Sequence, residues 1–288
     1  MEAFDELWDY GDPAASEKRF RELLPDLVAS GDESQRVQLL TQIARTLGLQ
    51  RKFDDARAVL AEAEARLDAA GNRARVRWLL ETGRCHNSSG SPEQSLAFFL
   101  DAWELAGQCG EDFHAVDAAH MLAIVEPAPE ERLAWTIRAL ELAESSDDGR
   151  VGKWPGSLHN NIGWTWHEQG EYERALEHFR KALAWRERQG DVGTIRIARW
   201  CIARCLRSLE RVDEALAMQR ALLEEYQAED APDGYVYEEL GECLLLLGRE
   251  DEARPWFARA HAELSVDPWL QAEEADRLAR LERLGQGR

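Results

Sequence analysis

Residues 159–176, HNNIGWTWHEQGEYERAL, hold several side chains of the kinds that bind ligands. The adjacent amides of Asn160 and Asn161 donate and accept hydrogen bonds at once, which suits an extended peptide backbone. Trp164 offers an aromatic surface, and His167 follows it by three residues, so the two share one side of a helix. These side chains indicate recognition of a ligand, and their helical spacing decides which of them face it.

Motifs for catalysis or metal binding do not occur in the sequence. Its seven histidines are scattered without His-Glu-x-x-His spacing, and neither a glycine-rich phosphate loop nor a G-x-S-x-G elbow is present. His120, in an irregular stretch over 112–146, is the histidine that we expect in a binding site besides His167. The sequence therefore predicts no enzyme, no cofactor and no metal.

The composition narrows the class of partner. Charged residues make up 31% of the 288 residues, and the net charge is −20. Such a chain repels nucleic acid and anionic membranes unless its positive charges gather in one place. No apolar run approaches the ~18 residues of a membrane span. The first residues do not resemble a signal peptide. The five cysteines show no CxxC spacing. We therefore expect a cytoplasmic protein with reduced thiols that binds neither nucleic acid nor membrane.

A helical hairpin recurs along the chain and positions these residues. In its clearest copy, an apolar stripe with Gly163 and Trp166 precedes a break at Gly170, and a second stripe begins at Ala175. The position of Ala175 recurs every 38 to 42 residues, and its seven occupants are Ser16, Ala56, Ser95, Leu133, Ala175, Ala215 and Ala253. So narrow a period over six intervals indicates a repeat protein.

This pattern resembles the tetratricopeptide repeat family. The family's order of aromatic, leucine, glycine, tyrosine, alanine and phenylalanine is met closely by residues 162–182 and partly elsewhere, although the period exceeds the usual ~34 residues. The asparagine pair before Ile162 is similar to a signature of the longer-helix branch that includes kinesin light chains and related adaptors. The resemblance implies an all-α, right-handed α-solenoid, in a family whose members carry peptides, scaffold complexes or sense ligands.

The period divides the chain into about seven hairpins, which we expect in a single domain over 1–288. The Gly/Pro-rich stretch 151–157 is either an extended loop or a soft boundary between two groups of hairpins. We favour one continuous solenoid because the period resumes in phase, and we expect a single capping helix over 268–284. The hairpins are expected near 1–31, 34–71, 73–108, 112–146, 157–190, 194–228 and 233–265.

The family resemblance also implies that the first helix of each hairpin lines a concave groove. With Gly163 and Trp166 buried, Asn160, Trp164 and His167 face this groove, and Asn161 lies at its edge. Equivalent groove positions in the other hairpins carry Arg45, Arg84, Trp200, Arg204 and Arg207. Trp164 and Trp200 then form an aromatic floor on adjacent hairpins.

Two interpretations of the arginines are open. Planar guanidinium groups suit carboxylates and phosphates, so the groove can be built for a peptide with acidic groups. Alternatively, the arginines pair with Glu81, Glu238 or other acids of adjacent repeats.

We predict a non-catalytic scaffold or adaptor for a peptide or protein segment. The alternatives are a structural subunit that self-associates or packs in a larger complex and, more weakly, a sensor of a small ligand; the sequence leaves the oligomeric state open.

Overall fold

The structure is a computed structural model that describes residues 3–287. All regular secondary structure in these residues is helical, which confirms the predicted all-α class of helical repeats. The chain divides into two compact units, Met1–Leu158 (unit 1) and His159–Arg288 (unit 2). The boundary lies directly after the Gly/Pro-rich stretch, inside helix α9 (Trp154–Glu168). One continuous solenoid over both units stays a prediction.

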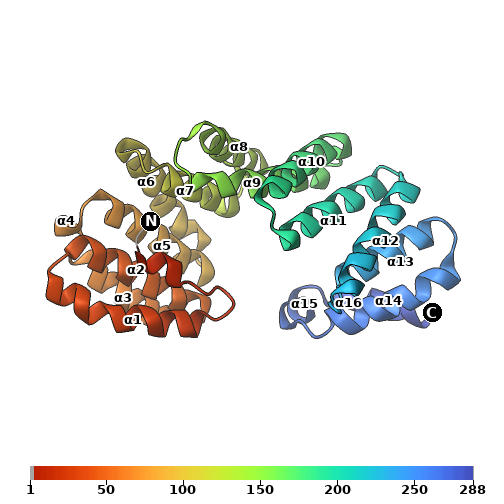
Figure 1. Ribbon diagram of the computed structural model, residues 1–288, viewed down its shortest axis with the longest axis horizontal. Helices are drawn as coiled ribbons and strands as arrows, with labels where there is room; N and C mark the ends of the chain where they lie inside the picture. Colours follow the sequence, from red (N-terminus) through yellow and green to blue (C-terminus); the bar gives the residue numbers. More distant parts are fainter. Residues whose placement is uncertain (1–2, 288) are drawn as a thin grey trace. The chain divides into compact units, whose positions relative to one another are not determined.

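Unit 1 is built from helical hairpins (Figure 1). Its first hairpin is incomplete, because only the 3-10 helix η1 (Ala3–Leu7) precedes α1. Pro13 and Pro92 begin α1 and α6, where the first helical residues need no amide donor. The elements that follow η1 are α1 (Pro13–Ser30), α2 (Glu33–Leu49), α3 (Phe53–Glu64), α4 (Leu67–Ala70), α5 (Asn72–Ser88), α6 (Pro92–Cys109), α7 (Asp112–Val125), α8 (Pro129–Ser145) and the 3-10 helix η2 (Val151–Lys153).

Unit 2 contains most of α9 and the helices that follow it. These are α10 (Tyr172–Gln189), α11 (Val192–Ser208), α12 (Val212–Ala228), α13 (Gly234–Leu246), α14 (Glu250–Leu264), α15 (Pro268–Glu273) and α16 (Ala275–Gln286). The expectation of a single capping helix over 268–284 is wrong, because the chain leaves helical geometry at Glu274, where φ is −127°. The break lets α16 pack against α14, and its buried Leu278 and Leu281 close the core of unit 2.

A contact between a glycine and a phenylalanine closes three of the hairpins. Gly83, Gly163 and Gly241 each face the ring of the phenylalanine that follows 16 residues later. A Cβ atom added at these glycines would lie 2.6 to 2.8 Å from a ring carbon, closer than real Cβ contacts. The small residues of the first helices therefore allow the close helix crossing that the sequence predicted.

The irregular hairpin of α7 and α8 has a register one residue away from the predicted one. We call the residue at the recurring position of Ala175 the anchor of its hairpin. In a regular second helix, the anchor and the residues four, seven and eleven positions later are buried, as in Ala253, Phe257, Ala260 and Leu264. In α8 the matching buried residues are Thr136, Ala139 and Ala143. The anchor of this hairpin is therefore the partly buried Arg132 rather than Leu133.

This register changes the assignment of residues on α7. Because His120 precedes Arg132 by twelve residues, it takes the position that Gly163 holds twelve residues before Ala175. Asp117 takes the groove position of Asn160 by the same count. The placement of His120 in the groove is thus corrected, and its neighbour Asp117 takes that place.

Candidate functional site

The first helices of the hairpins line a cavity in each unit. The cavity of unit 1 measures about 680 Å³ and that of unit 2 about 470 Å³. Helices α2, α5 and α7 contribute to the first, and α11 and α13 contribute to the second together with α16. The side of each unit on which these helices meet the cavity is called its inner face below. Each lining holds four Lys or Arg side chains and three carboxylates, so the predicted local excess of positive charge is present but small.

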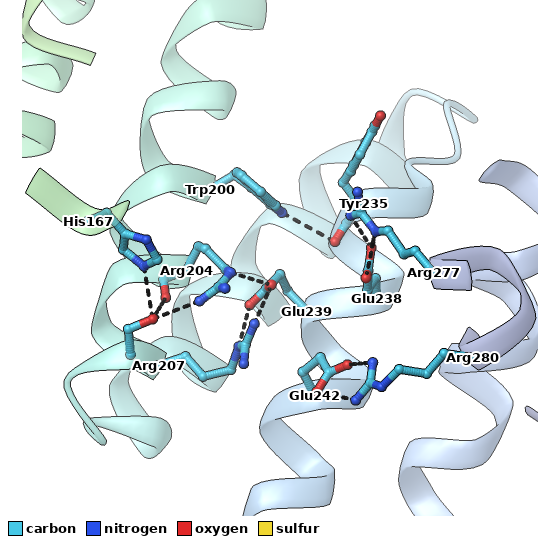
Figure 2. A network of polar contacts seen from close by, with 11 residues as sticks. His167, Trp200, Arg204, Arg207, Tyr235, Glu238, Glu239, Glu242, Arg277 and Arg280 are labelled. Carbon is cyan, nitrogen blue, oxygen red and sulfur yellow. Dashed lines mark hydrogen bonds and ion pairs between the residues drawn. The ribbon is translucent and has the colours of Figure 1, made fainter. Parts of the chain in front are cut away.

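Glu239 on α13 is the centre of the polar contacts in unit 2 (Figure 2). Its side chain is 5% exposed and lies between two arginines of α11. Arg207 donates to both carboxylate oxygens, from Nε at 2.7 Å and from Nη2 at 2.8 Å. The Nε atom of Arg204 lies 3.2 Å from Oε1. Both predicted groove arginines of this unit are therefore held by one buried acid.

Two further ion pairs join α13 to the last helix. Arg277 of α16 donates from Nη2 to Oε2 of Glu238 at 2.5 Å, and Arg280 pairs with Glu242 (Figure 2). Cations and carboxylates thus alternate over α11, α13 and α16. We call this set the ion-pair ladder; its members are Arg204, Arg207, Glu238, Glu239, Glu242, Arg277 and Arg280.

Unit 1 repeats the arrangement around Glu81 on α5, which is 6% exposed. Arg45 of α2 and Arg84 of α5 donate to its Oε1 atom at 3.1 and 2.6 Å. Arg84 also donates to Asp117 of α7 at 2.5 and 2.6 Å. Burial opposes the ionised form of Asp117, but the charge of Arg84 outweighs it and lowers the pKa of this carboxyl. Asp117 is therefore charged at neutral pH.

These contacts confirm the interpretation in which the arginines pair with acids between repeats. Glu81 is one of the acids that the sequence suggested, whereas Glu238 pairs with Arg277 instead of an arginine of the preceding hairpin. A carboxylate of a ligand would have to compete with Glu81 or Glu239 for the four predicted arginines. Because guanidinium groups engaged in charge-assisted bonds are already satisfied, the acid-binding role loses most of its basis at these positions.

Aromatic rings form a row beside the ladder. The ring centroids of Trp164 and Trp200 lie 6.1 Å apart, and those of Trp200 and Tyr235 also lie 6.1 Å apart. We call these three residues, on α9, α11 and α13, the aromatic row. Trp166, which was predicted to belong to the core, packs against the core of unit 2 with the guanidinium of Arg174 over its ring.

His167 and the two asparagines are tied to neighbouring side chains. The Nε2 atom of His167 lies 2.9 Å from the Ser208 hydroxyl. Burial lowers the pKa of His167 to about 4, and the charges of Arg204 and Arg207 act in the same direction. The Cys201 thiol donates to Oδ1 of Asn160 over 3.2 Å.

The side chain of Asn161 is partly buried, and its backbone carbonyl accepts from the Thr165 hydroxyl. Its place at the edge of the groove stays a prediction. Cys201 is buried, and burial raises the pKa of its thiol to about 12, so it stays protonated and keeps its hydrogen bond to Asn160. The five cysteines are free, as the sequence predicted.

The cavity of unit 1 has aromatic walls that the sequence did not indicate. Trp8 donates from Nε1 to Oε1 of Gln42 at 2.9 Å and stacks on Tyr10 with a ring distance of 4.6 Å. Arg77, on α5, is held by two hydrogen bonds to Asp5 at 2.6 and 3.2 Å. The remaining lining residues are Arg45, Leu80, Glu81, Phe113, His114, Asp117, Gly149, Arg150, Lys153 and Trp154.

Lys153 differs from the other cations of this lining. Arg45 is bound by Glu81, Arg77 by Asp5, and Arg150 by Asp148. Lys153 is exposed, and no carboxylate of residues 3–287 lies within ion-pair distance of it. Among the residues that the structure describes, Lys153 is therefore the lining cation without a carboxylate partner.

Several of these residues were missed by the sequence reasoning. Glu81 and Glu239 both occupy the position of Asn161. Glu81 stands one turn before Arg84 on α5, whereas Glu239 lies on α13, the inner helix that follows α11 with Arg204 and Arg207, so an acid beside the groove arginines was visible in the repeat alignment. Arg277 and Arg280 stand three apart on the capping element, opposite the acidic residues of α13, and that spacing was a usable signal. Counted back from Ser16, Asp5 takes the position of Trp164 and Trp8 that of His167, so the repeat phase also carried a signal for this segment.

The remaining predicted site residue, His120, does not line the cavity of unit 1. It is partly buried, and its ring lies 5.2 Å from that of Trp154. Burial lowers the pKa of His120. Within residues 3–287, no group of three or more His, Cys, Asp or Glu side chains is placed to hold a metal ion. No helix in the same part of the chain is both long enough and apolar enough to cross a membrane.

The hairpin geometry and the two lined cavities define a helical repeat protein with an inner face. The chain belongs to the tetratricopeptide repeat family. Family models described as tetratricopeptide repeat match residues 41–112, 156–188 and 202–268, which together make up more than half of the chain. No protein with a curated description matches the sequence.

Solved structures share the fold at low sequence identity. A Signal Transduction ATPase with Numerous Domains from Pyrococcus horikoshii, which has a tetratricopeptide repeat sensor, matches with TM-score 0.73 and 14% identity over 93% of this chain. The match spans 41% of that protein's chain. NprR bound to its cognate peptide NprX gives TM-score 0.55 and 16% identity over 98% of this chain and 81% of that one. The repeats of a putative kinesin light chain of Podosopora anserina give TM-score 0.53 and 14% identity over 65% of this chain and 94% of that one. These identities establish a common fold.

Proposed function

We propose that this chain is a non-catalytic scaffold that binds a peptide or protein segment on its inner face, with the cavity of unit 1 as the principal contact. The observation that carries the proposal is this cavity of about 680 Å³, which combines aromatic walls, oriented polar groups and Lys153, a cation without a carboxylate partner in residues 3–287. Its size falls in the range of ligand pockets, and few but well-placed polar groups are what such sites use for orientation. An acidic group of the ligand would meet Lys153.

The comparison with NprR supports a peptide as the ligand, because that protein carries its cognate peptide on a fold that this chain shares. The chemistry of the cavity fits the same class. Trp8 and Arg77 have their polar atoms satisfied by Gln42 and Asp5, so they are fixed in place before a ligand arrives. Preorganised walls reduce the entropy lost on binding.

Selection of short random peptides on the whole protein tests the proposal. Gly149 lines the cavity, and a Cβ atom added there meets no atom within 4 Å, so Gly149→Trp introduces a large side chain at the cavity from an open position. Gly107 on α6 has the same open surroundings away from the cavity, which makes Gly107→Trp the matched control. We expect selected peptides to lose at least about tenfold in affinity for Gly149→Trp, measured by fluorescence anisotropy. Failure to select any peptide, or equal binding to both variants, contradicts the proposal.

Self-association is the second candidate function, and a separate surface favours it. Val266, in the turn before α15, is 74% exposed, and Trp269, at the start of α15, is 61% exposed. Exposed apolar pairs of this kind favour contacts between molecules. Sedimentation equilibrium at several concentrations tests this function: a dimer that dissociates in Trp269→Glu supports it, and a monomer at all concentrations rules it out.

A further inference from the structure

Two histidines of unit 2 lie against each other between α9 and α10. The Nδ1 atoms of His159 on α9 and His178 on α10 are 3.2 Å apart, and the centroids of their rings are 5.3 Å apart. His159 is 4% exposed, and His178 is partly buried. Neither residue lines the cavity of unit 1 or that of unit 2, so the function proposed above does not involve them.

The separation of the two nitrogens matches that of two ligands on one metal ion. Histidine nitrogens bind Zn²⁺ at about 2.0 to 2.1 Å, so two of them at the tetrahedral angle stand about 3.3 Å apart. Square-planar or octahedral coordination brings neighbouring ligands to about 2.9 Å. The observed 3.2 Å is nearer to the tetrahedral value. Because the two rings come from two helices of one hairpin, the backbone holds this distance before an ion arrives.

The two rings are suited to bind an ion at neutral pH. Burial lowers the pKa of both histidines, and the charge of Lys181 acts in the same direction on both. Two neutral imidazoles share one hydrogen bond when the Nδ1 atom of one ring carries the proton. A metal ion takes the place of this proton, which moves to the Nε2 atom of the same ring, so that both Nδ1 lone pairs face the ion.

A carboxylate stands beside the histidine pair. Glu177 directly precedes His178 on α10, and its charge acts on both rings. Its side chain is 63% exposed and lies 2.7 Å from the Nζ atom of Lys181, in an exposed ion pair that contributes little stability. Glu177 can therefore leave Lys181 and turn toward the histidines at small cost. Two histidines, one glutamate and a water molecule are a ligand set that zinc proteins use.

We propose that His159 and His178 form a binding site for Zn²⁺, with Glu177 as a third ligand that moves in when the ion binds. The ion joins α9 to α10 within unit 2 and leaves its fourth position to water. The two histidines are already in place, whereas no group of three ligands is assembled in residues 3–287. The two histidines are 19 residues apart, which fits no short metal-binding motif, so sequence motifs do not reveal the site.

Calorimetric titration of the whole protein with Zn²⁺ tests the site. We expect one ion per chain, with an affinity that falls at least about tenfold in His178→Gln. His261→Gln changes a partly buried histidine of α14 and is the matched control. Cys109→Ser removes the partly buried thiol and should leave the affinity unchanged. Co²⁺ in place of Zn²⁺ should give the intense visible absorption of tetrahedral coordination.

Two exposed variants test the site without a change in the buried pair. Glu177→Gln removes the third ligand and should weaken Zn²⁺ binding about threefold or more. Lys181→Gln removes both the competitor for Glu177 and a positive charge that repels the ion, so it should strengthen binding about threefold. Opposite shifts from two neighbouring surface residues are not expected of an ion bound elsewhere, and they decide the question even if His178→Gln does not fold.

Three results would overturn the proposal. A lack of Zn²⁺ binding below about 100 µM leaves the histidines as a hydrogen-bonded pair of the hairpin. Binding that a folded His178→Gln variant retains in full places the ion elsewhere. Binding that depends on His178 but responds to neither Glu177→Gln nor Lys181→Gln excludes Glu177 as the third ligand. The peptide selection on unit 1 uses none of these variants, so either proposal can fail while the other stands.

Discussion

The buried glutamates of the inner faces decide what the arginines beside them can do. Within residues 3–287, Arg204 and Arg207 share Glu239 as their carboxylate partner, and Glu81 stands between Arg45 and Arg84. Such pairs contribute little over an apolar replacement, but loss of one partner leaves buried charge without compensation. The ladder therefore acts mainly to fix the positions of neighbouring inner helices.

Replacement of Glu239 by glutamine tests this role. Glu239→Gln keeps the shape of the side chain and removes its charge, which leaves two arginines facing each other. We expect the free energy of unfolding to fall by about 2 to 3 kcal/mol, measured by chemical denaturation. Glu252→Gln, which removes the exposed partner of Arg249, is the control and should have no measurable effect. Equal stability of the two variants would show that Glu239 does not hold the ladder together.

His167 gives the inner face of unit 2 a defined response to pH. Its pKa falls from an ordinary value of 6.5 to about 4 in the folded protein, first because of burial and then because of Arg204 and Arg207. A histidine whose pKa is lower in the folded than in the unfolded protein makes its full contribution to the free energy of unfolding above pH 6.5. This contribution is lost as the pH falls toward 4. Because the ring is only about half buried, we expect a loss on the order of 1 kcal/mol.

Two measurements check the pH response. The titration of the His167 ring by NMR should have its midpoint near pH 4. Denaturation of wild type and His167→Gln at pH 7 and pH 5 should show a smaller decline with acid in the variant. A midpoint near 6.5, or parallel declines, would mean that the ring is solvated and does not sense the arginines.

The four predicted groove arginines are paired within the protein, and their role in binding a ligand stays a prediction. The repeat phase placed Trp164, Trp200 and the four arginines on inner helices, because a helical period fixes direction from residue numbers alone. It did not identify Asp117 and Arg277 as partners, since ion pairs between repeats depend on side-chain conformation and on the register of two helices. The sequence therefore located the inner face, but the structure was needed to show that its arginines are neutralised.

At the scale of single hairpins, the glycine–phenylalanine crossing sets how closely two helices pack. Gly163→Ala would place its Cβ atom 2.6 Å from the Phe179 ring, so one helix must move. We expect a loss of about 1 to 3 kcal/mol in unfolding free energy, as for other overpacked cores. Gly107→Ala, with open space on an exposed helix face, should stabilise slightly instead. Partial rescue of Gly163→Ala by Phe179→Leu would assign the loss to this contact, and a lack of rescue would argue against it.

The hairpin of α11 and α12 lacks the glycine–phenylalanine contact and contains a destabilising buried side chain. Gln219 takes the place of the phenylalanine, is 0% exposed, and has neither Oε1 nor Nε2 within hydrogen-bond distance of any group in residues 3–287. A buried amide without partners costs about 1 to 3 kcal/mol. Gln219→Met, similar in volume, should raise the midpoint of thermal unfolding.

Gln219→Phe is the informative comparison. The first helix here has Ala203 where the three hairpins with the glycine–phenylalanine crossing have glycine, so the larger ring meets a Cβ atom. We expect this variant to be no more stable than the wild type, although it restores the residue of the family pattern. A strong gain for phenylalanine, or a loss for methionine, would mean that the amide of Gln219 is solvated.

The elements that the sequence mispredicted are those in which the repeat pattern fades. The regular hairpins follow from a period in which small and aromatic residues alternate over two helices. In α8 the anchor is Arg132, which no pattern of small residues reveals. The cap over 268–284 has leucines at helical spacing throughout, yet the chain breaks at Glu274 because α16 buries Leu278 and Leu281 against α14. Tertiary packing decides such cases over local preference.

At the scale of the whole molecule, each unit contains its own hydrophobic core. One cluster of buried residues extends from Ala175 to Leu281 within unit 2, and the clusters around Phe20 and Val37 lie within unit 1. In repeat proteins, stability is a sum of local terms that act between neighbours. A core mutation should therefore act mainly on the unit that contains it.

Phe257→Ala in α14 tests this partition. Removal of a fully buried ring costs about 3 to 5 kcal/mol, so unit 2 should open at lower denaturant concentration while unit 1 stays folded. Native-state hydrogen exchange then shows lost protection in α11 to α14 and unchanged protection in α2 and α5. Phe99→Ala in α6 is the reciprocal variant, because Phe99 is equally buried in unit 1, and it should reverse the pattern. Uniform loss of protection along the whole chain in both variants would show that the units unfold as one cooperative body, since neither core could then fail alone.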